Sequence, residues 1–137
     1  MADYFYSETS KRELQTCHPL LQRLFYEVLK VMDHKIIQGE RGKSLQDKYY
    51  YSGKSKVKWP HSPHNKKPSL AVDAAPCPLN WKDMNTFYYF AGIVKGTSEM
   101  MGIPIRWGGD WDGDNDLNDQ TFNDLCHYEL DIRRMQK

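Results

Sequence analysis

The chain has 137 residues, 19 of them basic and 18 acidic, and hydrophobic residues make up 39% of it. This length predicts one domain, residues 1–137, with its own core, and the composition is not that of a disordered chain. The nearly balanced charge gives no reason to expect nucleic-acid binding. The chain has no run of about 18 apolar residues, so membrane insertion is not expected.

The first third of the chain predicts two helices, a strand and a third helix. Ser10 and Glu13 match the S-x-x-E capping box that marks a helix start, and Pro19 suits the first turn of a second helix. From there one apolar stripe recurs at helical spacing: Leu20, Leu21, Leu24, Phe25, Val28, Leu29 and Met32. Residues 34–38 are typical of a strand and residues 44–51 of a helix.

Two loops and a second set of elements follow. Residues 54–68 are basic and proline-rich, and residues 108–123 are rich in Gly, Asp and Asn, so both are expected to be loops. The remaining elements are three strands, at 69–75, 103–107 and 125–132, and a long helix at 83–101. Three tryptophans are expected mainly in the core: Trp81, Trp107 and Trp111. Of these, Trp107 or Trp111 could instead line a cleft. This order predicts an α+β fold, with helices packed against a small, mainly antiparallel sheet.

His64 and Asp73 are the first pair of candidate ligands. His64 follows Ser62 in the basic loop, and Asp73 lies within the apolar strand sequence Leu-Ala-Val-Asp-Ala-Ala. A carboxylate in an apolar strand is costly unless it is paired or binds a metal. The alternative, which the spacing allows equally, is that Asp73 ends the strand and caps the turn at Pro76.

The last predicted strand carries a second pair of candidates. Cys126 and Tyr128 alternate with His127 and Glu129, so one face is apolar and the other presents a histidine and a glutamate. The polar face is either the wall of a site or simply solvated. Cys126 is expected on the opposite face, in the core.

Two histidines, one carboxylate and one open position are the donor set of a catalytic zinc site. Such a site needs a second carboxylate that takes and returns a proton. Asp124, three residues before His127, is the candidate. Strict alternation would place Asp124 on the face opposite His127, so it must lie at the end of the strand, where the loop sets its direction.

These motifs resemble those of the M15 zinc metallopeptidases. The matching features are Ser-x-His, a later Ala-x-Asp, and Asp-x-x-His-Tyr-Glu-Leu near the C-terminus, and the resemblance runs from about Pro19 to about Leu130. Within that family the chain is most similar to the L-alanyl-D-glutamate endopeptidases of phage endolysins. The resemblance implies a fold like that of the hedgehog and D-Ala-D-Ala peptidase domains, with the zinc site on the sheet.

The resemblance implies a set of site residues: the zinc ligands His64, Asp73 and His127, and the general base and acid Asp124. The family usually has six residues between the first histidine and the aspartate, whereas here residues 65–72 make eight. His61 is therefore the alternative first ligand. His64 is favoured because Ser62-x-His64 keeps the local spacing of the motif.

The resemblance also implies residues around the ligands. The family has an arginine in a Gly-x-Arg segment after the first strand, followed by a glutamine, and these match Arg41 and Gln46. Arg41 would stabilise a developing oxyanion or hold a substrate carboxylate, and Gln46 would brace the pocket. Ser62 would lie near the site, and Glu129 would orient a ligand from behind.

The loop at 108–123 contains a possible calcium site. Its aspartates fall on the alternating positions of a calcium loop: Asp110, Asp112, Asp114 and Asp116. The sixth position is Asn115 instead of glycine and the twelfth is Thr121 instead of glutamate, so the pattern is not that of an EF-hand. The loop is either a solvated turn or a looser calcium site that would order the segment leading to Asp124.

Lysines cluster in the loop around Trp59 and His61: Lys54, Lys56, Lys58, Lys66 and Lys67. A basic cluster with an aromatic residue could contact nucleic acid, draw in the carboxylates of a peptidoglycan stem peptide, or be solvated. The absence of an excess positive charge favours the last two.

The donor set predicts a zinc-dependent enzyme, and the resemblance implies a peptidoglycan endopeptidase that hydrolyses the L-alanyl–D-glutamate bond, as an endolysin does in host cell lysis. The alternatives are a D-Ala-D-Ala carboxypeptidase or dipeptidase, and a non-catalytic cell-wall-binding module on the same fold. The N-terminus has no basic segment followed by an apolar run, so no signal peptide is expected. We therefore expect a protein that stays in the host bacterial cytoplasm until it is released to the cell wall. We also expect it to be a monomer.

Overall fold

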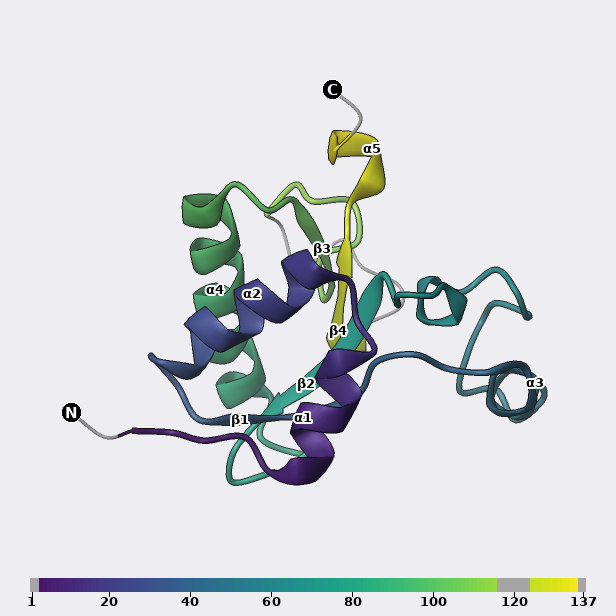
Figure 1. The fold of residues 1–137 in the computed structure, drawn as a ribbon, viewed down its shortest axis with the longest axis horizontal. Coiled ribbons are helices and arrows are strands. Elements are labelled where there is room, and N and C mark those ends of the chain that lie inside the picture. Colours follow the sequence, from purple (N-terminus) through teal and green to yellow (C-terminus); the bar gives the residue numbers. More distant parts are fainter. Residues whose placement is uncertain (1–2, 116–123, 136–137) are drawn as a thin grey trace.

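The computed structural model describes residues 3–115 and 124–135 of the chain. In these residues the helices are α1 (Glu8–Gln15), α2 (Pro19–Leu29), α3 (Lys43–Tyr51), α4 (Met84–Met101) and α5 (Ile132–Met135), with a short 3₁₀ helix η1 (Pro63–Asn65). The strands are β1 (His34–Gln38), β2 (Ala71–Pro76), β3 (Ile105–Gly108) and β4 (Asp124–Leu130) (Figure 1).

The four strands form one antiparallel sheet in the order β1-β2-β4-β3. The predicted α+β fold with a small antiparallel sheet is confirmed. β2 and β4 are neighbours at the centre of this sheet, and their register pairs Asp73 with His127. Two candidate ligands that are distant in the sequence therefore lie side by side on adjacent strands.

The core lies between one face of the sheet and helices α2 and α4, which pack against each other (Figure 1). Phe25 of α2 and Phe90 of α4 both contact the ring of Tyr128 on β4, at centroid distances of 5.6 and 6.1 Å. The apolar stripe predicted for α2 is thus the face that the sheet covers. His127 and Glu129 alternate with Tyr128, so they lie on the opposite face.

α1 begins one turn earlier than its capping-box motif predicts. Its N-cap is Ser7, whose side chain accepts a hydrogen bond from the backbone N–H of Ser10. Ser10 and Glu13 are therefore inside the helix, and their side chains instead accept hydrogen bonds from the backbone N–H groups of Ile36 and Gly39. The side chains of Ser10 and Glu13 therefore hold β1 and the residue after it in place, and they do not mark the start of the helix.

α3 is set apart from the helical layer in Figure 1, and the segment that follows it leads to η1. The predicted loop at 54–68 is irregular apart from η1. Of the other predicted loop, residues 116–123 lie outside the described residues. No helix in the described ranges combines the length and the hydropathy that crossing a membrane would require.

Candidate active site

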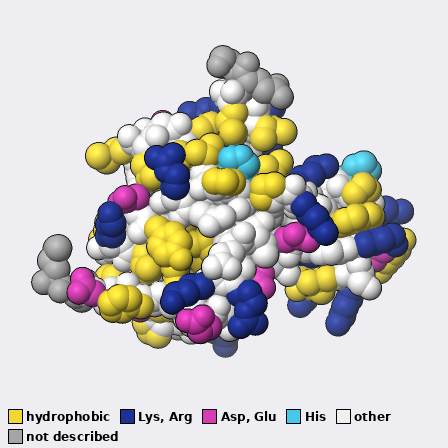
Figure 2. All heavy atoms as spheres, viewed as in Figure 1, with side chains coloured by type: hydrophobic (Ala, Val, Ile, Leu, Met, Phe, Trp, Pro, Cys, Tyr) yellow, Lys and Arg dark blue, Asp and Glu magenta, His cyan; other side chains and the backbone are white. Residues whose placement is uncertain are grey.

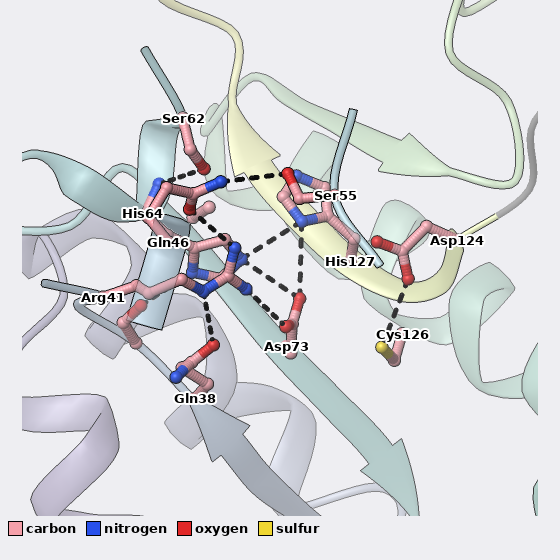
Figure 3. Close-up of polar contacts among 12 residues, drawn as sticks. Gln38, Arg41, Gln46, Ser55, Ser62, His64, Asp73, Asp124, Cys126 and His127 are labelled. Carbon is pink, nitrogen blue, oxygen red and sulfur yellow. Dashed lines mark hydrogen bonds and ion pairs between the residues drawn. The ribbon is translucent and has the colours of Figure 1, made fainter. Parts of the chain in front are cut away.

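The exposed side of β2 and β4 forms the floor of a cleft of about 560 Å³. The segment at 54–63 provides one wall, and Trp111 and the start of β4 provide another. Seven of the residues predicted for the site line this cleft: Arg41, Ser62, His64, Asp73, Asp124, His127 and Glu129. Figure 3 shows most of these side chains directed toward one another around Asp73.

Three side-chain atoms from three elements meet at one point of the cleft. His64 Nε2 lies 3.2 Å from Asp73 Oδ1 and 3.3 Å from His127 Nδ1, and the distance from His127 Nδ1 to Asp73 Oδ1 is 3.3 Å (Figure 3). His64 comes from η1, Asp73 from β2 and His127 from β4. His61 is exposed and does not belong to this group.

The outer nitrogen of each histidine ring has a hydrogen-bond acceptor. His64 Nδ1 lies 2.7 Å from the carbonyl oxygen of Gly39, and His127 Nε2 lies 2.8 Å from Glu129 Oε1. A neutral imidazole has one N–H, and donating it outward leaves a lone pair on the other nitrogen. The two inner nitrogens, Nε2 of His64 and Nδ1 of His127, can then both act as metal ligands.

The surroundings of this point favour a positive charge. Burial alone would raise the pKa of Asp73, but His64 and His127 hold it well below its usual range. Burial alone would lower the pKa of His127, but hydrogen bonds and charges of Asp73 and Glu129 raise it to about 9. Asp73 and Glu129 thus stabilise a positive charge at this point, whether a proton on His127 or a metal ion carries it.

The three inner atoms have the spacing that a tetrahedral metal site requires. Zinc binds nitrogen and carboxylate oxygen at about 2.0 to 2.1 Å, and neighbouring corners of such a tetrahedron are about 3.3 Å apart. The observed separations of 3.2 and 3.3 Å match this edge. Two lone pairs and a carboxylate at that spacing repel one another without a cation, so the donor set fits a metal ion.

Asp124 lies beside the triad because the pairing of β3 with β4 is irregular. Trp107 pairs with Tyr128, but the next residue, Gly108, pairs with Asp124, so three residues of β4 have no partner on β3. This bulge breaks the strict alternation and turns Asp124 toward the cleft. Burial, followed by the nearby charge of Asp73, raises the pKa of Asp124.

The same irregularity changes the position of Cys126. The expectation that its side chain faces the core is wrong, because Cys126 lines the cleft and its Sγ donates to Asp124 Oδ1 at 3.4 Å. Burial, together with the negative charges of Asp73 and Asp124, raises the pKa of the Cys126 thiol. The thiol stays protonated and acts as a weak donor to the candidate base.

Arg41 is held in place by two glutamines and lies next to Asp73, one of the three residues that meet in the cleft. Its Nε donates to Gln38 Oε1 at 2.8 Å, its Nη1 donates to Gln46 Oε1 at 2.9 Å, and its Nη2 lies 3.7 Å from Asp73 Oδ2. Burial lowers the pKa of Arg41, and the charge of Asp73 opposes that shift. The guanidinium therefore lies beside the candidate ligand, where it can balance negative charge.

Gln46 braces the wall of the cleft from inside α3. It is fully buried, and its Nε2 donates to Ser55 Oγ at 3.0 Å and to the carbonyl oxygen of Val57 at 2.7 Å. Ser55 and Val57 both line the cleft. One side chain thus connects the guanidinium of Arg41 to the segment that closes the cleft.

Ser62 positions His64 through the backbone. It is the N-cap of η1, and its side chain accepts a hydrogen bond from the backbone N–H of His64 at 3.2 Å. Asn65 completes a capping box by accepting from the backbone N–H of Ser62 at 3.0 Å. Asn65 and Gly39 were not among the predicted site residues, although the Ser-x-x-Asn spacing is a usable signal for Asn65.

The acidic loop places some of its predicted calcium ligands together. Carboxylate oxygens of Asp110, Asp112 and Asp114 lie within 4.8 Å of one another, and Asp110 is buried. Asp116 lies outside the described residues. Exposed acidic groups often gather without an ion, so this arrangement does not by itself indicate calcium.

Comparisons with known proteins show the family and the fold to which this chain is similar. A family model described as "Phage L-alanyl-D-glutamate peptidase" matches residues 2–131. The L-alanyl-D-glutamate peptidase of Escherichia phage T5 is 27% identical over an alignment of 133 residues that covers 91% of this chain and 96% of that protein. The crystal structure of Serratia marcescens L-Ala D-Glu endopeptidase ChiX has the same fold, with a TM-score of 0.78, 24% identity, and coverage of 98% of this chain and 94% of that one.

Proposed function

The chain belongs to the phage L-alanyl-D-glutamate peptidase family and is a peptidoglycan endopeptidase, and we propose that it depends on zinc held by His64, Asp73 and His127. The observation that carries this proposal is the convergence of two imidazole nitrogens and one carboxylate oxygen at the edge length of a zinc tetrahedron. The bond cut is the L-alanyl–D-glutamate amide of the stem peptide.

When bound at these three ligands, zinc supplies a Lewis acid with one open coordination position. Asp124 is the group that takes a proton from the attacking water and returns it to the leaving amine. Its raised pKa supports this role, because a carboxylate that must also act as an acid works best when its pKa approaches the working pH. Arg41 balances the negative charge that develops on the substrate beside Asp73.

The basic rim of the cleft supports an acidic substrate. Lys54 and Lys56 line the same cleft as Arg41, and Figure 2 shows Lys and Arg side chains gathered over α3 and the segment that follows it. Stem peptides carry several free carboxylates, so a cationic wall raises their local concentration. Nucleic-acid binding has no comparable support, since the net charge of the chain is only +1.

The decisive experiment is digestion of purified peptidoglycan by the zinc-loaded protein, with and without a zinc chelator, and identification of the new termini by mass spectrometry. We expect free L-alanine carboxyl groups and free D-glutamate amino groups that disappear with the chelator. Release of free D-alanine would identify the D-Ala-D-Ala carboxypeptidase alternative. The non-catalytic alternative predicts that the protein binds to the wall without producing new termini.

A calcium ion in the loop remains a prediction that the comparisons do not support. It rests on the grouping of Asp110, Asp112 and Asp114 and on Asp110 Oδ1, which is buried without a hydrogen-bond partner among the described residues. If calcium binds there, millimolar calcium raises the melting temperature of the wild type and not that of Asp110→Asn. An equal shift in both proteins, measured by calorimetry, contradicts the prediction.

Three broader statements also remain proposals. The chain is one peptidase domain over residues 1–137, it acts as a monomer, and it stays in the host cytoplasm until it is released to the cell wall. The family match over residues 2–131 supports the first. Light scattering of the purified protein tests the second, and fractionation of infected cells before lysis tests the third.

A further inference from the structure

An exposed aromatic surface borders the cleft beyond Asp124. Trp81, in the connection between β2 and α4, is 57% exposed, and its ring stacks on Phe87 with centroids 5.4 Å apart and an interplanar angle of 19°. Met84, at the start of α4, is 46% exposed. We call Trp81, Phe87 and Met84 the aromatic platform. The expectation that Trp81 belongs to the core is wrong, because only its stacked face is covered.

The aromatic platform is continuous with the catalytic cleft. A second hollow of about 300 Å³ is lined by the platform and by Asp124, Leu125 and Cys126. Trp81, Asp124 and Cys126 line both this hollow and the cleft. A ligand that occupies the cleft can therefore extend past the candidate base and onto the indole of Trp81.

The opposite end of the cleft has different chemistry. There the guanidinium of Arg41 lies 4.7 Å, and the ammonium of Lys54 5.3 Å, from the ring centre of Tyr49. In the described part of the chain no lysine or arginine lines the hollow at the aromatic platform. In Figure 3 Arg41 and Asp124 lie on either side of Asp73 and His127. The cleft is thus cationic at one end, whereas the other end, beyond Asp124, is aromatic and has no lysine or arginine among its described lining residues.

The substrate of the proposed reaction has the same two-ended character. On the carboxyl side of the scissile bond, D-glutamate is linked through its side chain and keeps a free α-carboxylate. On the amino side, L-alanine is joined by an amide to the lactyl group of N-acetylmuramic acid, which leaves no charge there. A single residue spans at most about 3.6 Å, so the sugar must lie close to the reacting carbonyl.

We propose that Trp81 binds the N-acetylmuramoyl sugar that carries the stem peptide, while the cationic end binds the D-glutamate carboxylate. This inference rests on the proposed function and adds a determinant of its specificity. The C–H face of a pyranose ring stacks on an indole and keeps its hydroxyls in water, which suits a large aromatic ring that is apolar in its body and open to solvent. Phe87 fixes the plane of the indole before the sugar arrives.

The test compares two substrates that differ only in the sugar. One is N-acetylmuramoyl-L-alanyl-γ-D-glutamyl peptide, and the other is the same peptide with an N-acetyl group in place of the muramoyl group. We expect Trp81→Ala to lower kcat/KM for the muramoyl substrate about tenfold, mainly through KM, and to leave the acetyl substrate within about twofold. Trp81→Phe restores much of the loss because it retains a stacking surface.

Two further variants separate the sugar effect from general damage. Tyr89→Ala removes an exposed aromatic ring on α4 that does not line the cleft, and it leaves the kcat/KM for both substrates unchanged. Lys54→Gln lowers kcat/KM for both substrates, since both carry the D-glutamate carboxylate. A loss in Trp81→Ala that is equal on both substrates, or absent on the muramoyl substrate, overturns the proposal. If the wild type cuts neither substrate, the proposed function itself fails.

Discussion

The two candidate histidine ligands use different ring nitrogens, and the residue behind each ring explains why. Gly39 offers a carbonyl oxygen to Nδ1 of His64, and Glu129 offers a carboxylate to Nε2 of His127. The partner of the outer nitrogen selects the tautomer and leaves the inner nitrogen available. A residue pattern can suggest that a histidine binds a metal, but the nitrogen it uses depends on these neighbours.

Replacing the candidate base tests its role directly. Asp124→Asn keeps the shape of the side chain but cannot take a proton, so we expect turnover to fall about 100-fold or more while zinc remains bound. Zinc content by atomic spectroscopy and hydrolysis of the muramoyl peptide measure the two effects. Glu8→Gln, an exposed carboxylate on α1, is the matched control. Retained turnover in Asp124→Asn would exclude Asp124 as the base.

The carboxylate behind His127 is expected to strengthen metal binding by that ring. Glu129→Gln keeps an acceptor 2.8 Å from the ring but removes its charge. We expect the zinc dissociation constant to rise about tenfold, as for other carboxylates that support a ligating histidine. Competition with a chelating dye measures this constant, and circular dichroism checks that the fold persists. An unchanged dissociation constant would show that the contact does not support the ligand.

At the scale of elements, the junction of α1, β1 and η1 places His64. The backbone N–H of Gly39 donates to Glu13 Oε1 at 3.0 Å, and that of Glu40 donates to Thr16 Oγ1 at 2.7 Å. The backbone N–H of Arg41 donates to the carbonyl oxygen of His64 at 2.7 Å. The end of β1 is therefore fixed between the first helix and the turn that carries the first candidate ligand.

Gly39 allows this junction to close. A Cβ at Gly39 would collide with the side chain of Thr16, the carbonyl oxygen of Glu13 and the sulfur of Cys17. Gly39→Ala should lower the free energy of unfolding by about 2 kcal/mol and weaken zinc binding, because overpacking shifts the carbonyl group that orients His64. Gly42→Ala is the control, since nothing lies within 4 Å of its added Cβ. Urea unfolding and dye competition measure both quantities, and equal effects of the two substitutions would contradict the argument.

At the scale of the whole molecule, one buried histidine links the N-terminal segment to three elements. His34 of β1 is 2% exposed, shares a hydrogen bond with the hydroxyl of Tyr6, and packs against Phe25 of α2 and Phe90 of α4. Burial lowers its pKa to about 4 from the ordinary value of 6.5, although the carbonyl group of Met32 and the charge of Asp33 oppose that shift.

This histidine makes the stability of the fold depend on pH. Above the unfolded pKa of 6.5 neither state binds the proton, so the full stability is present. Below it the unfolded chain binds the proton first, and stability falls as the pH approaches 4, by up to about 3 kcal/mol. His34→Gln should flatten this slope between pH 6.5 and 4 relative to the wild type. His61→Gln, at an exposed histidine, should leave this slope unchanged. Urea unfolding at each pH measures the slopes. Identical slopes for His34→Gln and the wild type would contradict the assignment of the slope to His34.

Periodicity and residue chemistry determined much of this protein from the sequence alone. The apolar stripe of α2 predicted the helix and its buried face, and the strand at His34–Gln38 has the predicted bounds. The sequence singled out His64, Asp73 and His127, which the structure brings together, while their role as zinc ligands stays a proposal. These features were readable because they depend on local spacing and on the cost of placing a carboxylate in an apolar strand.

Only the tertiary structure decided which way several side chains point. Asp124 and Cys126 face the cleft because Gly108 pairs with Asp124 across a bulge. The alternation of side chains along a strand cannot predict this register. The backbone partners of Ser10 and the open face of Trp81 are likewise set by neighbours distant in the sequence. Local pattern specifies what a segment is, whereas the direction of a side chain at the end of a strand depends on which strand lies beside it.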